Sequence, residues 1–127
     1  MKKLLLFLFF LSAGLLQVNA QKKAPQKLLR HVVMFSFKPE STPSQIKEVT
    51  DAFAALPKKI KQIKTFEWGT NNSPENLSEG FTHCFFVTFL SEKDRSIYLP
   101  HAAHKAFGDI LRPILDKVLV FDYWTNK

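Results

Sequence analysis

The sequence is poor in several features that define large classes of proteins. A single cysteine among 127 residues excludes an internal disulfide framework and a Cys-rich zinc site. Four glycines exclude collagen-like and Gly-rich linker character, and no period of about 20 to 50 residues repeats along the chain. The sequence contains no Gly-rich phosphate loop, no G-x-S-x-G and no paired-carboxylate motif. None of the common catalytic signatures therefore indicates a reaction.

Apolar and aromatic side chains are abundant instead. Hydrophobic residues make up 46% of the chain and aromatic residues 13%, which rules out a disordered protein. The length suits one ordinary domain. The formal charge is +7, but the lysines fall into separate clusters at 22–30 and 58–64, without a recognition motif. We therefore expect solvated lysines and no nucleic-acid partner.

The first 20 residues have the three parts of a secretory signal peptide. Lys2 and Lys3 give a positive start, an apolar run follows over 4–16, and Ala20 is a small residue before the expected cleavage point. The alternative is an uncleaved membrane anchor. The apolar run over 4–16 is shorter than the roughly 20 residues that such an anchor needs to span a bilayer. We expect export to the periplasm or the extracellular space, with no stable membrane anchor after cleavage. Residues 21–28 are expected to be a disordered leader.

The remaining residues, 29–124, predict one domain with the element order β-α-β-β-α-β. Strands are expected over 31–38, 65–70, 82–90 and 118–124, where β-branched and aromatic residues gather. Helices are expected over 43–56, 92–99 and from about 100 to 115, with a predicted apolar face of Ala103, Phe107, Ile110, Leu111, Ile114 and Leu115. This order is the split βαβ pattern of the ferredoxin-like α+β fold, with a four-stranded antiparallel sheet.

Alternation along the strands places apolar side chains on both faces of the predicted sheet. In the first strand Val33 and Phe35 lie on one face, and Val32 and Met34 lie on the other. Two main helices can cover only one face, and a sheet face in contact with water should be polar. A second copy stacked sheet on sheet would cover the other face, so we expect a homodimer.

Polar side chains that can carry chemistry are concentrated in one segment, 98–104. His104 precedes Phe107 at helical spacing, which turns it toward the apolar face. A histidine in an apolar pocket can shuttle a proton, and a nearby tyrosine such as Tyr98 can donate a hydrogen bond to an oxyanion. The structural alternative is a capping histidine and a core tyrosine. His101 and His104 have no third ligand in the sequence, so we expect no metal site.

The pocket itself is predicted where the first and third strands face the second long helix. The expected lining consists of His31, Val33, Phe35, His83, Phe85 and Phe107. His31 and His83 share their faces with apolar residues, but each is alternatively a strand-end histidine with satisfied hydrogen bonds. Cys84 follows His83 and therefore points to the opposite face of the sheet, where we expect a small, unreactive residue.

Several motifs, in order, resemble the stress-responsive A/B barrel (Dabb) family. They are Arg30-His31-Val32-Val33-Met34-Phe35, Ala55-Leu56-Pro57, Trp68-Gly69, Glu79-Gly80-Phe81-Thr82-His83, Tyr98-Leu99-Pro100-His101-Ala102-Ala103-His104, Ala106-Phe107 and Val118-Leu119-Val120-Phe121-Asp122-Tyr123. The resemblance covers about residues 29–124. It implies a dimeric α+β barrel with a cavity between each sheet and its helices.

One branch of that family resembles polyketide cyclases, which close a linear polyketide by intramolecular aldol condensation. The resemblance implies a histidine base at His104 and an orienting tyrosine at Tyr98, with His31 and His83 at pocket-facing positions. The usual His-Pro-x-His is changed here to His101-Ala102-Ala103-His104.

The function we expect is that of an exported dimeric barrel that binds a small apolar molecule without a cofactor. The first alternative is a cyclase-like acid–base enzyme that uses His104 and Tyr98. The others are a haem- or quinone-oxidising monooxygenase of a related dimeric barrel fold, and a purely structural dimer.

Overall fold

The computed structural model describes residues 23–126, which form four strands and four helices in the order β-α-α-β-β-α-α-β. They are β1 (Leu29–Phe37), α1 (Pro43–Ala54), α2 (Leu56–Lys59), β2 (Thr65–Thr70), β3 (His83–Phe89), α3 (Glu92–Tyr98), α4 (Ala102–Leu111) and β4 (Leu115–Trp124). The predicted signal peptide, 1–20, and the start of the predicted leader lie outside the described residues. No helix among the described residues is long and apolar enough to cross a membrane.

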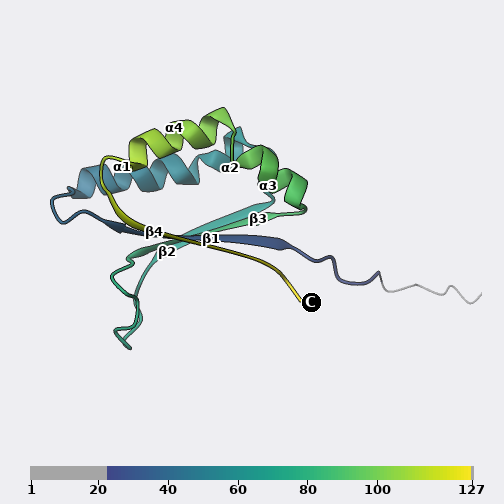
Figure 1. Ribbon diagram of the computed structural model, residues 1–127, viewed down its shortest axis with the longest axis horizontal. Coiled ribbons are helices and arrows are strands. Elements are labelled where there is room, and N and C mark those ends of the chain that lie inside the picture. The colour runs from purple at the N-terminus through teal and green to yellow at the C-terminus, as the bar shows by residue number, and fades with distance from the viewer. Residues whose placement is uncertain (1–22, 127) are drawn as a thin grey trace, which may run out of the picture.

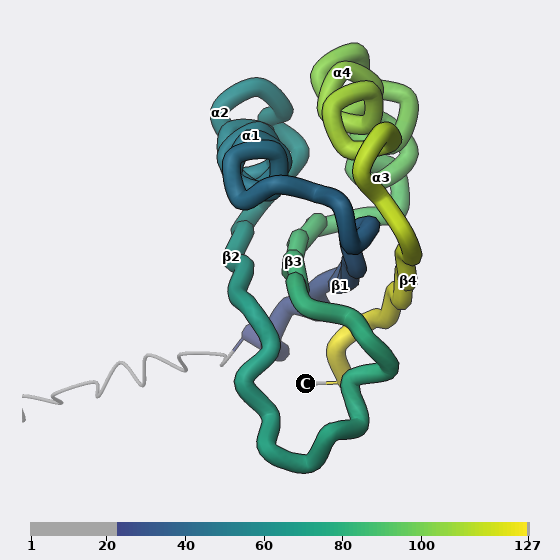
Figure 2. The backbone as a smooth tube through the Cα atoms, turned by 90° about the vertical axis from the view of Figure 1, so that its left-hand side faces the viewer, coloured from purple at the N-terminus to yellow at the C-terminus, as the bar shows by residue number. Residues whose placement is uncertain are grey.

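The helices lie on one side of a single antiparallel sheet (Figure 1). The strand order is β2-β3-β1-β4, with β1 paired to both β3 and β4. Figure 2 looks along the helices and shows them together above the strands, while no helix or strand of residues 23–126 covers the opposite face of the sheet. The predicted ferredoxin-like α+β fold is confirmed.

Helix α1 begins as its sequence predicts and ends earlier. The Thr42 hydroxyl accepts from the Gln45 amide at 3.2 Å, and the Gln45 side chain accepts from the Thr42 amide at 2.8 Å. This reciprocal capping box satisfies amides that would otherwise lack a partner. The helix was expected to reach Leu56, but it ends at Ala54. Because Pro57 has no amide hydrogen, it cannot continue α1, and it lies instead in the first turn of α2.

Helix α4 is also shorter than predicted. It ends at Leu111 and β4 already begins at Leu115, because Pro113 cannot donate the hydrogen bond that would continue the helix. Ile114 and Leu115 therefore do not lie on a helical face. Ile110, predicted on the apolar face, is partly exposed.

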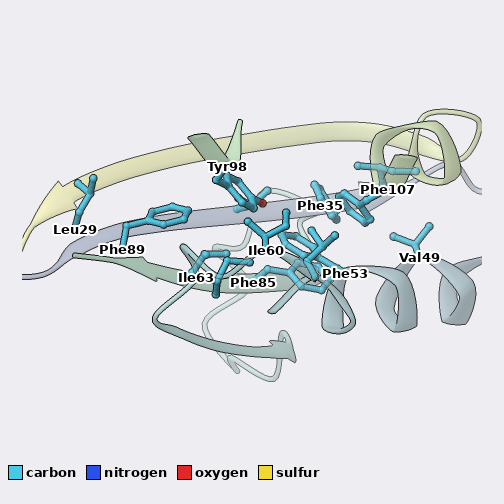
Figure 3. Close-up of a cluster of buried hydrophobic side chains, with 14 of the residues drawn as sticks. Leu29, Phe35, Val49, Phe53, Ile60, Ile63, Phe85, Phe89, Tyr98 and Phe107 are labelled. Atoms are coloured by element: carbon cyan, nitrogen blue, oxygen red, sulfur yellow. The ribbon is translucent and has the colours of Figure 1, made fainter. Parts of the chain in front are cut away.

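The core lies between the helices and the sheet, and aliphatic side chains surround a cluster of packed aromatic rings in it (Figure 3). Phe53 of α1 is at its centre. Its ring centroid lies 4.4 Å from that of Phe85 on β3 and 4.5 Å from that of Phe107 on α4. Three elements that are distant in sequence therefore meet at one side chain.

The uncovered face of the sheet is apolar, as the alternation predicts. Leu119, Phe121 and Tyr123 of β4 are all exposed, and Phe121 exposes 61% of its surface. Val32 and Met34 of β1 pair with Phe121 and Leu119 in register, so they belong to the same face. A continuous apolar surface of this kind marks a site of association.

We predict that Phe53→Ala lowers the free energy of unfolding by about 3–5 kcal/mol, because it removes the ring on which the helices and the sheet pack. Urea unfolding followed by circular dichroism, at one protein concentration, measures the change. Leu77→Ala is the matched control, since Leu77 is 72% exposed and the change should stay within about 0.5 kcal/mol. A loss below about 1 kcal/mol for Phe53→Ala would contradict this account of the core.

Candidate functional site

A cavity of about 670 Å³ lies between α4 and the edge of the sheet formed by β1 and β4. This volume is within the range of about 300–1,000 Å³ typical of sites for small molecules. The walls are mostly apolar and consist of His31, Val33, Phe35, Phe53, Tyr98, Leu99, His104, Lys105, Phe107, Gly108, Asp109, Leu111, Arg112, Val118 and Val120. Six of the residues predicted from the sequence are therefore brought together here: His31, Val33, Phe35, Tyr98, His104 and Phe107.

The floor of the cavity follows from the pairing of β1 with β4. Val33 pairs with Val120, and Phe35 pairs with Val118. Because alternate residues of a strand point to the same face, these four side chains form an apolar floor under α4. At the end of this row His31 pairs with Asp122, which replaces the apolar floor with a polar pair.

Tyr98, the last residue of α3, is fully buried at the polar end of the cavity. Its ring lies between those of Phe89, at 5.0 Å, and His104, at 4.3 Å. Its hydroxyl has no hydrogen-bond partner among the described residues. Burial raises the pKa of Tyr98, and the nearby Asp122 carboxylate raises it further, so the phenol keeps its proton. A buried polar group in a native structure normally has a partner, so this hydroxyl is an unused donor in a side chain of the cavity wall.

His104 lies in the first turn of α4, where one hydrogen bond fixes its tautomer. Its Nδ1 lies 2.9 Å from the carbonyl oxygen of Leu99. A carbonyl only accepts, so Nδ1 donates and the neutral ring keeps its lone pair on Nε2. His101 has the capping role that the structural alternative gave it, since its Nδ1 accepts from the Ala103 amide at 3.0 Å. No group of three metal-ligating side chains occurs among residues 23–126.

His31 is held by a charged network that links three elements. Its Nδ1 lies 2.7 Å from one carboxylate oxygen of Asp122, and Arg95 of α3 donates to the other at 2.7 Å. The carboxylate accepts both bonds, so His31 also carries its proton on Nδ1. Burial lowers the pKa of His31, and the hydrogen bond and charge of Asp122 oppose that effect in part. His31 is therefore a neutral histidine of fixed orientation beside Tyr98, with ring centroids 5.7 Å apart.

Two predicted pocket residues are not brought to this cavity. Phe85 is fully buried because Phe53 stacks on it. His83 is at the far end of β3, where its ring stacks on Trp68 and the Thr82 hydroxyl bonds its Nδ1. A residue can therefore share a strand face with the cavity residues and still lie outside the cavity wall, because the helices do not cover that face evenly.

The partners of His31 were missed in the sequence. Asp122 interrupts the apolar alternation of the last strand on the face that carries Val118 and Val120, and that interruption was the available signal. Arg95 gives no such signal, because it contacts Asp122 only through the tertiary fold. Cys84 lies on the other face, and burial raises the pKa of its thiol, in keeping with the unreactive residue expected there.

A ferredoxin-like domain with a cavity between sheet and helices, edged by a tyrosine and two histidines, defines a class of α+β barrel proteins. The sequence pattern of the stress responsive A/B barrel domain matches residues 29–125. The chain belongs to this family.

Two plant proteins are among its relatives. The stress-response A/B barrel domain-containing protein HS1 of Arabidopsis thaliana is 42% identical over 95 residues, which cover 75% of this chain and 87% of that protein. Olivetolic acid cyclase of Cannabis sativa is 35% identical over 99 residues, which cover 78% of this chain and 98% of the cyclase.

Solved structures show the same fold. The hydroxynitrile lyase of Passiflora edulis superposes with a TM-score of 0.76 at 27% identity, covering 81% of this chain and 97% of the lyase. A dimeric ferredoxin-like protein of unknown function from Bacteroides fragilis superposes with a TM-score of 0.64 at 26% identity, covering 77% of this chain and 96% of that one. The relatives and structural neighbours of this chain therefore include two named enzymes and a dimeric protein.

We predict that His31 titrates below its ordinary pKa of 6.5 in the folded protein. The unfolded chain then takes up a proton before the folded chain does, so this group makes the free energy of unfolding fall as the pH drops below about 6.5. Asp122→Asn removes a carboxylate that raises this pKa, so His31 should titrate lower still. NMR titration of the histidine rings measures both values.

The matched control for this titration is Asp51→Asn, which removes an exposed carboxylate outside the network. It should leave the pKa of His31 unchanged. A pKa of His31 above 6.5, or a rise on Asp122→Asn, would contradict the network described here.

Proposed function

We propose that this protein binds a small, mainly apolar molecule that carries an oxygen acceptor, such as a carbonyl, in the cavity between sheet and helices. The observation that carries the proposal is the buried, unpartnered hydroxyl of Tyr98. The apolar walls supply the affinity, because burying apolar surface is favourable at roughly 25 cal/mol per Å². The hydroxyl orients the ligand, because an acceptor placed beside it would receive the hydrogen bond that the hydroxyl does not donate within residues 23–126.

A second function, acid–base catalysis, is favoured by the position of His104. Its ring centroid lies 4.3 Å from that of Tyr98, and its Nε2 keeps a lone pair. With a carbonyl compound bound, Nε2 would accept a proton from the adjacent carbon. The electron pair would move to the carbonyl oxygen, where the Tyr98 hydroxyl stabilises the developing charge. A polyketide-cyclase-like reaction would use this step, and the named cyclase and lyase among the relatives support an enzymatic role.

We further propose that the protein acts as a homodimer, with two sheets stacked into an α/β barrel. The apolar surface of Leu119, Phe121 and Tyr123 supports this proposal, because these side chains would otherwise face water. Structural neighbours described as dimeric share the fold. Export through a cleaved signal peptide, to the periplasm or the extracellular space, is part of the same proposal and rests on residues 1–20 of the sequence.

The two functions are separated by deuterium exchange at the carbon next to a carbonyl, measured by NMR in heavy water. We expect the protein to accelerate exchange in methyl hexyl ketone, a small apolar carbonyl compound. His104→Gln should reduce the acceleration by about a hundredfold or more, since it removes the base. Tyr98→Phe should reduce it by about a hundredfold, since it removes the donor to the oxyanion.

Lys47→Gln, on the exposed side of α1, is the control for this assay and should exchange at the wild-type rate. If the ketone binds but its deuterium exchange is no faster than in buffer, the binding function stands and the catalytic function is contradicted. If the ketone neither binds nor exchanges, the cavity is not a site for carbonyl compounds and the proposal fails.

A further inference from the structure

The residues that line the cavity change from polar to apolar along the length of its floor. On the floor, His31 and Asp122 pair at one end, and Phe35 and Val118 pair at the other. At about 3.3 Å per strand residue, these two pairs lie about 13 Å apart. The roof follows α4 from His104 to Arg112, which is about 12 Å at 1.5 Å per helical residue. Floor and roof therefore have matching lengths, and Arg112 lies at the end far from Tyr98.

The far end of the cavity contains Arg112, whose guanidinium has more hydrogen-bond donors than its one described side-chain bond uses. One guanidinium nitrogen of Arg112, Nη1, donates to Asp109 at 2.8 Å. That pair is exposed on both sides, so it contributes little and can rearrange. The other terminal guanidinium nitrogen, Nη2, lies only 3.7 Å from the point where a Cβ on Gly108 would stand. The guanidinium thus extends over Gly108, a residue of the cavity wall.

Gly108 is the second observation at this end of the cavity. Glycine is unfavourable in the interior of a helix, and packing does not require it here. A Cβ at this position would meet only the flexible end of Arg112 within 4 Å. What the missing side chain provides is open space in the cavity wall between His104 and Arg112.

The opposite end is less suited to an anion. Asp122 places a carboxylate beside His31 there, and its charge is already shared with Arg95. The hydroxyl of Tyr98 at the same end requires an acceptor, which a neutral carbonyl satisfies. A ligand that satisfies both ends therefore has a neutral oxygen at Tyr98 and a negative group at Arg112.

We propose that the ligand is an amphipathic anion, with a neutral oxygen at Tyr98, an apolar body over Gly108 and a carboxylate or similar group at Arg112. This inference rests on the proposed function, since it names the class of molecule that the cavity takes. A guanidinium is the side chain best matched to a carboxylate, because it presents paired donors in one plane.

The test compares octanoate with octanol, which share an apolar chain and differ in charge. Binding is followed at pH 8 and 0.15 M salt by amide NMR shifts, with Gly108 and Tyr98 as local reporters. The wild-type protein should bind octanoate about two- to fivefold more tightly than octanol, as expected for one solvent-exposed ion pair. Arg112→Gln should remove this preference and leave octanol binding unchanged.

Lys47→Gln is the control, since it removes one exposed positive charge outside the cavity wall, and it should keep the preference for octanoate. Lys105→Gln removes a positive charge from the wall at the His104 end, so it tests the orientation of the ligand. Gly108→Leu should abolish binding of both probes while the amide spectrum stays folded, because leucine fills the space and is the better helix former.

The outcomes distinguish this inference from the function on which it rests. Equal binding of the two probes overturns the anionic ligand and leaves the apolar cavity in place. Loss of the preference with Lys105→Gln but not with Arg112→Gln overturns the assigned orientation. If neither probe binds the wild-type protein, the proposed binding function itself fails.

Discussion

The antiparallel pairing of β1 with β4 determines the rest of the site. It places Asp122 opposite His31 and continues into the apolar floor of Val33, Phe35, Val118 and Val120. A slip by one residue would turn every one of these side chains to the other face of the sheet. It would also separate His31 from the carboxylate that fixes its tautomer. The polar end and the apolar body of the cavity are thus two consequences of one register.

Two features of the cavity cost stability and have no role in holding the fold together. The Tyr98 hydroxyl is buried without a partner among the described residues, which costs about 1–3 kcal/mol. Gly108 costs roughly 0.5–1 kcal/mol relative to alanine in a helix interior. Both residues line the same cavity. Residues that lower the free energy of unfolding and lie together at one place are expected at a functional site.

The sequence predicts the architecture well, because local signals determine it. The start of the first helix at Pro43, the strand alternation and the apolar second face of the sheet are all visible without the structure. The ends of α1 and α4 were placed too late. Pro57 was expected to end the first helix after Leu56, but α1 already ends at Ala54. The apolar periodicity continued past Pro113, whose missing donor ends α4.

The site was predicted less completely than the fold. Tyr98 and His104 were found because they are close in sequence. Asp122 and Arg95 were missed because their contacts depend on strand register and on the docking of α3, which no local pattern encodes. His83 was assigned to the pocket from its strand face and from the family resemblance, yet Trp68 stacks against its ring and it lies outside the cavity wall.

Native mass spectrometry of the protein, purified gently from its own host, tests most directly whether two copies of this domain associate and whether the cavity of each copy holds a small molecule. The account predicts a dimer of chains that begin at Gln21, each with an additional small mass, which would be that of an amphipathic acid. A monomer without additional mass would contradict the account, because neither the apolar sheet face nor the Tyr98 hydroxyl would then have its partner.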